Sequence, residues 1–445
     1  MNWDSEMDSI SLKDAVSHIV DNRGKTCPTS DAGMPLIATN CVKSSSLYPT
    51  KEKIRYVDTE TYETWFRGHP EPGDILFVNK GSPGEVCLVP DPVDFCIAQD
   101  MVSLRANEKK IDPSYLFAVL RDCRTKAAIE NLHVGTMIPH FKKTDFDKLL
   151  LPLPLRTDQE FIGQFYLDLS KRIALHQKMN HTLEDIAKAI FKSCFVDFDP
   201  VRAKAEGRPT GLPPEISDFF PDELVDSEIG EIPKGWIKTE LDEIAEVIDP
   251  HPSHRAPKAV SDGYPFAGIG DIDEMGNINL AKARIIAEEA VTEQEQTYQI
   301  NESSVGFGRV GTVGKVVRLR KQDFRFAISP TLAIVNPRTH DFGAFVYLLL
   351  KSQGFQRQVE NNMTGSTRPA IGIKVLRGLT TALPEQTVKT MQVFQSLTQS
   401  MLLKGDLLNS ETQILSELRD TLLPKLISGE LRIPDAEKLL EEAGI

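Results

Sequence analysis

The feature that most constrains this chain is a long internal repeat. The positions of Phe77 and Phe307 differ by 230 (307 − 77 = 230), and the glycine-containing segments 81–84 and 311–314 follow them at the same offset. The same offset relates Glu130-Asn131 to Glu360-Asn361, Gly135-Thr136 to Gly365-Ser366, Pro139 to Pro369, and Leu153-Pro154 to Leu383-Pro384. Solenoid repeats have periods of about 20–50 residues, so this longer period indicates tandem duplication of a whole domain.

Within each copy the hydrophobic pattern changes at the Leu-Pro step. Before it, short segments rich in β-branched and aromatic residues and bounded by Gly and Pro predict strands, as at 74–78 and 314–317. We expect a helix to interrupt these strands at 114–131 and again at 342–361. The predicted fold class is therefore α+β, with two repeated globular domains of mixed strands and helices.

After the Leu-Pro step the apolar period becomes helical in both copies. Apolar heptad positions of the first copy are Ile162, Phe165, Leu169, Met179, Leu183, Ile186 and Ile190, with Arg172 and His176 off the pattern. Those of the second copy are Phe394, Leu397, Met401, Leu408, Leu415, Leu418 and Leu422, with Lys404 and Glu411 off the pattern. Because a lone helix of about 40 residues would not be stable in water, we expect the two to form an antiparallel coiled coil about a pseudo-twofold axis.

The chain order predicts the domain boundaries. Residues 199–236 contain prolines at six positions and an acidic run, which is typical of a linker. The predicted segments are a first domain at 1–154, a central long helix at 155–198, a linker at 199–236, a second domain at 237–384, a C-terminal long helix at 385–431 and a short acidic helical tail at 432–445.

Composition favours an ordinary globular protein with 40% hydrophobic and 26% charged residues. No long apolar run and no leader-like start are present, so we expect a soluble, cytoplasmic protein without a membrane segment. The net charge of −13 argues at first against nucleic acid. Charge is uneven, however, because the segment 304–325 carries six Lys or Arg and one Asp. An acidic chain of this kind can still present a basic face.

Several signals for catalysis, cofactors or metals fail on inspection. The segment 306–311 matches G-x-G-x-x-G, but the residues after it predict a strand, whereas a dinucleotide fingerprint opens a helix. His251 and His254 lie in a proline-containing loop without clear further ligands, so a surface turn is the preferred interpretation. The six cysteines form no C-x-x-C pair. We therefore predict no catalytic residue, no cofactor and no metal site.

The order of the segments resembles the specificity subunit of type I restriction-modification systems. The resemblance is carried by "LLLPLPLRTDQEFIG" (149–163) and "LTTALPEQTVKTM" (379–391), each leading into a long helix, by "IPKGW" (232–236) and by the closing "TLLPKLISGEL" (421–431). In the first copy nothing near the N-terminus matches "PKGW". The resemblance covers roughly the whole chain through the order and duplication of these motifs.

This resemblance implies a non-catalytic, sequence-specific DNA-binding subunit with two target-recognition domains held apart by two spacer helices. Such a subunit reads a bipartite target in double-stranded DNA and binds two methyltransferase subunits, with restriction and translocase subunits in the full complex. It would work in phage defence in the cytoplasm of a bacterium or archaeon. Two other classes stay open: a non-catalytic adaptor whose duplicated domains bind protein, and a single-chain methyltransferase, which the missing cofactor motifs disfavour.

Two loops in each copy are the candidate DNA contacts. Glycines let the backbone approach DNA, and Lys, Arg and hydroxyl side chains bind phosphates or base edges. The candidates in the first loop are Lys80, Gly81, Ser82 and Gly84, matched by Arg309, Gly311, Thr312, Gly314 and Lys315. Those in the second loop are Thr136, His140, Lys142 and Lys143, matched by Ser366, Thr367 and Arg368. The alternatives are an ordinary hairpin turn for the first loop and a structural brace for the second.

The ends of the long helices are the candidate contact with the methyltransferase subunits. The residues expected there are Phe191, Phe195, Leu422 and Leu426. Burial of such heptad residues within the chain's own core is the alternative, and periodicity alone does not separate the two.

Overall fold

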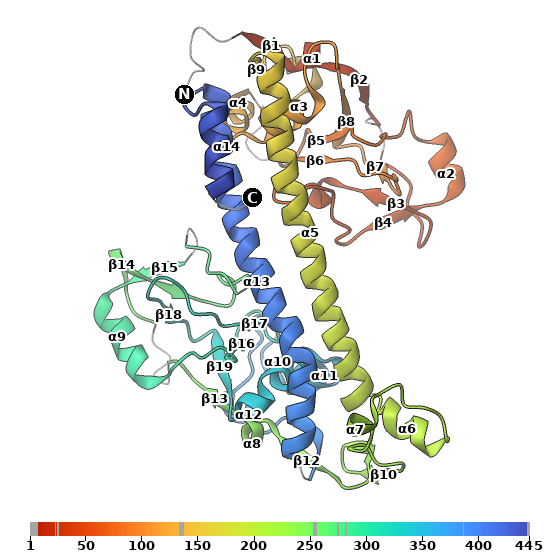
Figure 1. Ribbon diagram of the computed structural model, residues 1–445, viewed down its shortest axis with the longest axis vertical. Coiled ribbons are helices and arrows are strands. Elements are labelled where there is room, and N and C mark those ends of the chain that lie inside the picture. Colours follow the sequence, from red (N-terminus) through yellow and green to blue (C-terminus); the bar gives the residue numbers. More distant parts are fainter. Residues whose placement is uncertain are drawn as a thin grey trace. The chain divides into compact units, whose positions relative to one another are not determined.

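The computed structural model describes residues 8–22, 24, 26–132, 138–251, 256–273, 276–280, 283–385 and 387–442 (Figure 1). Contacts divide the chain into two compact units, which we call unit 1 (Met1–Lys178 with Ser410–Ile445) and unit 2 (Met179–Asn409). Each boundary falls inside a long helix, so a unit combines one globular domain with half of each helix. No helix in the described ranges is long and apolar enough to span a bilayer.

The first domain, in unit 1, is built from short strands and short helices. Its strands are β1 (Ser9–Ser11), β2 (Val16–Val20), β3 (Met34–Ile37), β4 (Arg55–Val57), β5 (Ile75–Val78), β6 (Val86–Leu88), β7 (Cys96–Ile97), β8 (Met101–Ala106) and β9 (Leu150–Pro152). Its helices are α1 (Leu12–Ala15), η1 (Thr39–Cys41), α2 (Thr59–Thr64), α3 (Pro113–Arg121), α4 (Cys123–Leu132) and η2 (Lys143–Asp145).

The second domain, in unit 2, repeats these elements. Its strands are β12 (Trp236–Glu240), β13 (Ala245–Ile248), β14 (Ala259–Ala267), β15 (Arg284–Ile286), β16 (Val305–Gly308), β17 (Val316–Arg318), β18 (Ala327–Ile328), β19 (Leu332–Pro337) and β20 (Thr380–Pro384). Its helices are α8 (Leu241–Ile244), α9 (Glu288–Thr297), η3 (His340–Phe342), α10 (Gly343–Lys351), α11 (Gln353–Asn362) and α12 (Ile373–Arg377).

Strand pairing shows that the two domains share one topology. Among the described residues the first domain has sheets ordered β2-β8-β5-β6, β4-β3-β7 and β1-β9, and the second has β13-β19-β16-β17, β15-β14-β18 and β12-β20. The registers agree too, since Ile75 pairs with Leu88 and Val305 pairs with Arg318, and both partners are shifted by the offset of the repeat. The repeated Phe77 and Phe307 are both fully buried. The duplicated α+β fold expected from the repeat is confirmed.

The single helix expected in each copy is two helices. Asp122 separates α3 from α4, and Ser352 separates α10 from α11. Both residues have an extended ψ (137° and 146°), which interrupts the helical hydrogen bonds. The Ser352 hydroxyl caps α11 by accepting from the backbone N of Phe355 (3.3 Å), and Asp122 accepts from the backbone N of Arg124 (2.8 Å). Short polar side chains in this position favour a helix start over a continued helix.

The two long helices are α5 (Arg156–Phe195) and α13 (Thr387–Ser428), coloured yellow to green and blue in Figure 1. Within unit 1 the buried Arg419 donates to the hydroxyl of Ser170 (3.3 Å), and His176 lies 3.6 Å from Glu411. Within unit 2 Asn180 donates to Asn409 (2.6 Å). The partner number on α13 falls as the number on α5 rises, so the helix halves pair antiparallel in unit 1, as expected for the coiled coil.

The predicted heptad pattern is largely right for α13 and partly wrong for α5. Leu408, Leu415 and Leu422 are buried as expected. In α5, however, Met179 and Ile186 are 39% and 42% exposed. The apolar side chains buried along the second half of α5 are instead Ala187, Phe191, Cys194 and Phe195. The contacts of α5 with α13 include the polar His176 and Asn180. An apolar pattern does not reveal polar residues at a helix contact, so the predicted heptad positions of this part of α5 are wrong.

The predicted linker is folded. It contains α6 (Asp199–Ala205), α7 (Pro214–Ser217) and a hairpin of β10 (Leu224–Ser227) with β11 (Gly230–Pro233). The rings of Phe198 and Phe220 lie 5.6 and 6.1 Å from the ring of Trp236, and Val201 and Ile232 are also buried. Buried apolar side chains within this segment, together with Phe198 just before it, therefore outweigh its linker-like composition. After α13, the tail forms the expected helix, α14 (Ile433–Glu442).

Candidate nucleic-acid interface

In the first domain the two candidate loops lie against each other. Lys80 and His140 form an isolated antiparallel bridge. The backbone N of Gly81 donates to the carbonyl of Pro139 (3.0 Å), and the backbone N of Phe141 donates to the carbonyl of Asn79 (2.9 Å). We call residues 79–84 together with 138–143 loop pair 1. Thr136, with Gly135, lies outside the described residues.

The second domain repeats this contact with the same register. Val310 and Ala370 form the bridge, the backbone N of Gly311 donates to Pro369 (2.9 Å), and the backbone N of Ile371 donates to Arg309 (2.9 Å). We call residues 309–314 together with 364–371 loop pair 2. Each contact is shifted from its counterpart by the offset of the repeat, so the duplicated domain has kept not only its sheets but also this junction between two loops distant in sequence.

The glycines of the first loop divide into two kinds. Gly81 and Gly311 adopt positive φ (95° and 79°), and a Cβ there would meet nothing within 4 Å. A Cβ on Gly84 would lie 3.0 Å from Ile129 on α4, and one on Gly314 would lie 2.3 Å from the amide oxygen of Gln356 on α11. The first glycine therefore allows an open turn, whereas the second lets the hairpin pack on its helix. Gly84 and Gly314 thus have a structural explanation that the DNA-contact prediction did not include.

In loop pair 2 the second loop is a closed hairpin, which we call the finger (364–370). Thr364 and Ala370 exchange two backbone hydrogen bonds (2.9 and 2.8 Å), and Gly365 turns the chain at φ 85°. A Cβ on Gly365 would lie 2.9 Å from the carbonyl oxygen of Arg368. The predicted residues Ser366, Thr367 and Arg368 are all exposed at the tip of the finger. Thr312, in the first loop of the pair, is exposed as well.

Three of the six polar residues of loop pair 1 are lysines. Lys80, Lys142 and Lys143 are exposed, as is Ser82, and His140 is half-buried. The amino group of Lys80 lies 4.0 Å from Asp100, and that of Lys143 lies 3.7 Å from Asp21. The pair of Lys80 is exposed on both sides, and such pairs contribute little to stability, whereas the Asp21 side chain that faces Lys143 is only 15% exposed.

Two predicted contacts of the second domain point inward. Arg309 has only 8% of its side chain exposed, and it donates to Asp249 (2.8 Å) and to the carbonyl of Pro330 (3.0 Å). Lys315 donates to the carbonyls of Ile269 and Ile272 (2.9 and 2.7 Å). The reason is register: Arg309 occupies the position of the buried Asn79, not that of Lys80. Both cations satisfy groups of their own domain, so neither is proposed as a DNA contact in the folded chain.

The expected partner contacts also lie in the cores. Phe191 and Phe195 are 3% and 5% exposed, and their rings lie 5.3 and 5.0 Å from that of Phe345 on α10. Leu422 and Leu426 are 7% and 5% exposed in the core of unit 1. The alternative interpretation of these four residues, burial in the chain's own core, therefore describes them.

Exposed apolar side chains recur along each long helix instead. On α5 they are Leu175, Met179 and Ile186, and on α13 they are Leu403, Leu407 and Ile414, all between 39% and 61% exposed. In both sets the second residue follows the first by four positions, and the third follows the second by seven. This spacing keeps all three side chains on one face of the helix. We call them the α5 stripe and the α13 stripe. The heptad pattern missed this face because it assigned one apolar face per helix and placed Met179 and Ile186 in the buried seam.

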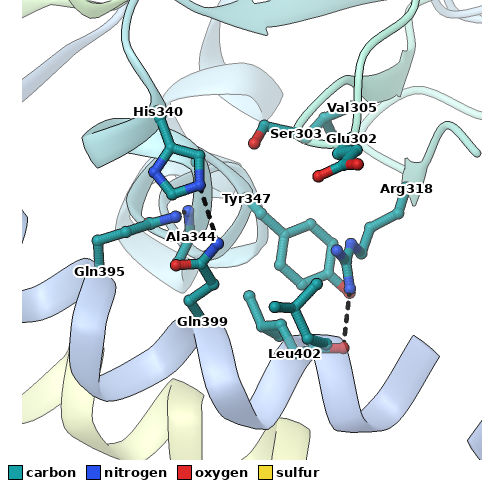
Figure 2. Close-up of a pocket in the computed structure, with 12 residues that line it drawn as sticks. Glu302, Ser303, Val305, Arg318, His340, Ala344, Tyr347, Gln395, Gln399 and Leu402 are labelled. Atoms are coloured by element: carbon teal, nitrogen blue, oxygen red, sulfur yellow. Dashed lines mark hydrogen bonds between the residues drawn. The ribbon is translucent and has the colours of Figure 1, made fainter. Parts of the chain in front are cut away.

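Each domain is braced on a long helix within its own unit. Figure 2 shows the joint of unit 2, where Gln395 on α13 accepts from the backbone N of Ala344 on α10 (2.9 Å) and Gln399 contacts His340 (2.8 Å). Arg318, which follows the first loop of loop pair 2, donates to the carbonyl of Leu402 (3.3 Å). The cavity between these side chains is only about 30 Å³, so the domain packs closely on α13 at this joint.

Charged side chains strengthen the joint of unit 2. Asp406 on α13 accepts from Arg318 (2.7 Å) and from Arg320. Glu184 on α5 accepts from Tyr347 (2.9 Å) and from Lys351, both on α10. Burial alone would raise the pKa of Glu184, but the hydrogen bond and charge of Lys351 and the charge of Lys188 together outweigh burial, so the net shift of this pKa is downward. The carboxylate therefore stays ionised in the folded chain.

The joint of unit 1 uses a close approach of two helices. Gln159 at the start of α5 accepts from the backbone N of Asp112, which precedes α3 (2.9 Å). A Cβ on Gly163 of α5 would lie 2.4 Å from the backbone N of Tyr115 and 2.4 Å from the hydroxyl of Ser114. Arg124 on α4 donates to the carbonyl of Pro424 on α13 (2.7 Å). The first domain is thus attached to both long helices of its unit through hydrogen bonds between side chains and backbone groups.

Comparisons with known proteins show what this chain is similar to. Residues 16–185 match the family described as type I restriction modification DNA specificity domain. The chain is 24% identical to the specificity subunit of the type I restriction enzyme MjaIX of Methanocaldococcus jannaschii over 82% of this chain and 78% of that protein. It is 25% identical to the HindI specificity subunit of Haemophilus influenzae over 81% of this chain and 86% of that protein.

A solved structure shares the fold. The S subunit of the type I restriction-modification system of M. genitalium superposes with a TM-score of 0.53 at 14% identity, over 96% of this chain and 98% of that one. The resemblance of this chain to type I specificity subunits is therefore confirmed by sequence, and the fold of two domains with two long helices is confirmed by structure.

Proposed function

We propose that this chain is the DNA-recognition subunit of a type I restriction-modification complex and reads a bipartite target in double-stranded DNA. The observation that carries the proposal is the repeated junction of two loops, which puts exposed hydroxyls and cations on each of two domains of one topology. Two similar surfaces on one chain suit two half-sites separated by base pairs that neither surface reads.

The contact residues of the proposal are those that the structure leaves accessible. In loop pair 1 they are Lys80, Gly81, Ser82, His140, Lys142 and Lys143, and in loop pair 2 they are Gly311, Thr312, Ser366, Thr367 and Arg368. Thr136 remains a prediction from sequence. Lysines suit the phosphates, while the hydroxyls and Arg368 suit both phosphates and base edges.

The proposed partners supply the chemistry. We propose that two methyltransferase subunits dock on the α5 stripe and the α13 stripe, since two exposed apolar stripes of one spacing suit two copies of one partner. Restriction and translocase subunits would join in the full complex, in the cytoplasm of the host. The chain itself would do no catalysis, and methylation of DNA by the purified chain alone would contradict this.

Mapping modified bases in the host genome, with the gene present and deleted, tests the proposed function. We expect modification that depends on the gene, at sites made of two short defined sequences with a fixed gap. The competing function is a protein-binding adaptor with duplicated domains. Binding of the complex to mixed-sequence duplexes separates the two, because DNA recognition predicts an affinity that falls steeply as salt rises, whereas an adaptor predicts no binding.

A further inference from the structure

We infer that the two domains hold DNA by different means: loop pair 1 through three lysines on the phosphates, and loop pair 2 through the finger, whose Arg368 reads a base edge. This inference rests on the proposed DNA recognition and names the chemistry that each half-site meets. The repeat alone predicts two domains that bind DNA in the same way. The difference between them comes from side chains that differ between loop pair 1 and loop pair 2.

The lysines of loop pair 1 form a cluster suited to phosphates. Lys80 follows β5, and Lys142 and Lys143 follow the bridge at His140, so the backbone hydrogen bonds between the loops bring all three onto one junction. Lys80 and Lys143 are 47% and 41% exposed, at 4.0 and 3.7 Å from their carboxylates. Lysine is a flexible point charge without a planar donor pair, which favours phosphate over a particular base.

Loop pair 2 has lost this cluster. At the offset of the repeat, the counterparts of Lys80, Lys142 and Lys143 are Val310, Gly372 and Ile373. The remaining cations of its first loop and the residue after it, Arg309 and Lys315, are bound to Asp249 and to backbone carbonyls. Among residues 309–315 and 363–374, the exposed cations are Arg368 in the finger and Lys374, which follows the counterpart of Lys143. This junction therefore offers one exposed lysine where loop pair 1 offers three.

The finger presents Arg368 in a defined position. Two backbone hydrogen bonds between Thr364 and Ala370 close it, and Gly311 holds Pro369, the residue next to Arg368, from the other loop (2.9 Å). A closed hairpin loses little conformational freedom on binding, which favours specific contacts. The planar guanidinium forms paired hydrogen bonds, most often to the O6 and N7 acceptors of guanine. We therefore assign a guanine to the half-site read by the second domain.

The test uses the full chain assembled with its methyltransferase subunits, on a duplex carrying the mapped target and on a mixed-sequence duplex of equal length. The lysine variant combines Lys80→Gln, Lys142→Gln and Lys143→Gln. Its matched control removes three exposed lysines outside the loop pair, Lys13→Gln, Lys109→Gln and Lys171→Gln. The finger variants are Arg368→Gln and Arg368→Lys, the second of which keeps the charge without the planar donor pair.

We expect the lysine variant to lower the slope of log affinity against log salt by about 2–3, at about 0.9 per phosphate contact. Its affinity for the target duplex and its affinity for the mixed-sequence duplex should fall by the same factor. The control should change the slope by less than about 1. Both finger variants should lose about tenfold or more discrimination at one base pair of one half-site. Arg368→Gln should change the slope by about 1 at most.

Three results would overturn the inference while leaving the proposed function intact. The first is an unchanged salt slope in the lysine variant. The second is an equal loss of affinity for the target duplex and the mixed-sequence duplex in Arg368→Gln. The third is wild-type discrimination between base pairs in Arg368→Lys. If the wild-type complex shows no salt-dependent binding to either duplex, the proposed function itself fails and the inference fails with it.

Discussion

Arg309 and Arg368 belong to one loop pair, but they have opposite environments. The guanidinium of Arg309 is paired with Asp249, which is itself only 17% exposed, whereas Arg368 is exposed at the tip of the finger. Removing one member of a buried ion pair leaves an uncompensated charge, so its cost is large. Removing an exposed side chain leaves no such penalty.

We therefore predict that Arg309→Ala lowers the free energy of unfolding by about 3 kcal/mol, while Arg368→Ala changes it by less than about 0.5 kcal/mol. Chemical denaturation of the full chain, followed through the transition of unit 2, measures both. Equal shifts in the two variants would contradict the inward orientation of Arg309.

Glu184 gives the second domain a defined pH dependence. Because the folded pKa of Glu184 lies below its ordinary value of 4.5, the ionised carboxylate contributes stability above that value. This contribution is lost as the pH falls through the lower folded pKa. We predict that the difference in unfolding free energy between wild type and Glu184→Gln is full at neutral pH and shrinks below about pH 4.5.

Denaturation at a series of pH values measures this difference. Asp185→Asn is the matched control, since the neighbouring Asp185 side chain is 73% exposed and pairs with Lys188 on its own helix (3.4 Å). Its difference from wild type should stay near zero at every pH. A pH-independent effect of Glu184→Gln would mean that the carboxylate charge does not stabilise the joint.

At the scale of elements, the crossing of α3 and α5 depends on Gly163. An alanine Cβ there would lie 2.4 Å from the backbone N of Tyr115, which cannot move without displacing α3. We predict that Gly163→Ala destabilises unit 1 by about 2 kcal/mol despite the better helix propensity of alanine. Thermal or chemical unfolding of the full chain checks this.

The control for this substitution is Gly354→Ala in α11. A Cβ at Gly354 would meet nothing within 4 Å, so alanine should be neutral or stabilise the helix by up to about 1 kcal/mol. Destabilisation by Gly354→Ala of the same size as by Gly163→Ala would show that loss of glycine itself, and not the close crossing, is responsible.

At the scale of the whole molecule, the two stripes predict the stoichiometry of the complex. Replacing Leu175, Met179 and Ile186 by Gln removes the α5 stripe, and replacing Leu403, Leu407 and Ile414 removes the α13 stripe. We expect the wild-type chain to bind two methyltransferase subunits, either variant to bind one, and the combined variant to bind none, as measured by native mass spectrometry.

Leu155→Gln is the control for the stripes, because Leu155 is 75% exposed but lies outside both helices. This variant should keep two partner subunits. Retention of two subunits by the combined variant would place the partner contact elsewhere on the chain.

The sequence by itself determined the duplication, the α+β class, the two long helices and the positions of the candidate loops. These follow from period and composition, which are properties of neighbouring residues in the chain. The structure keeps the same offset at the Leu-Pro step. The backbone N of Leu12 donates to the carbonyl of Leu149 (2.9 Å) and that of Leu241 to the carbonyl of Leu379 (2.8 Å), so Leu153 is the counterpart of Leu383.

Only the tertiary structure decided which side chains face inward. Lys80 and Arg309 look equivalent as cations beside a glycine turn, but one is exposed and the other is paired with Asp249, 60 residues away in the chain. Met179 and Ile186 continue an apolar heptad, but they are exposed because Asn180 pairs with Asn409 instead. The physical reason is the same in both cases: burial depends on partners distant in sequence, and no local pattern records which partner a side chain will meet.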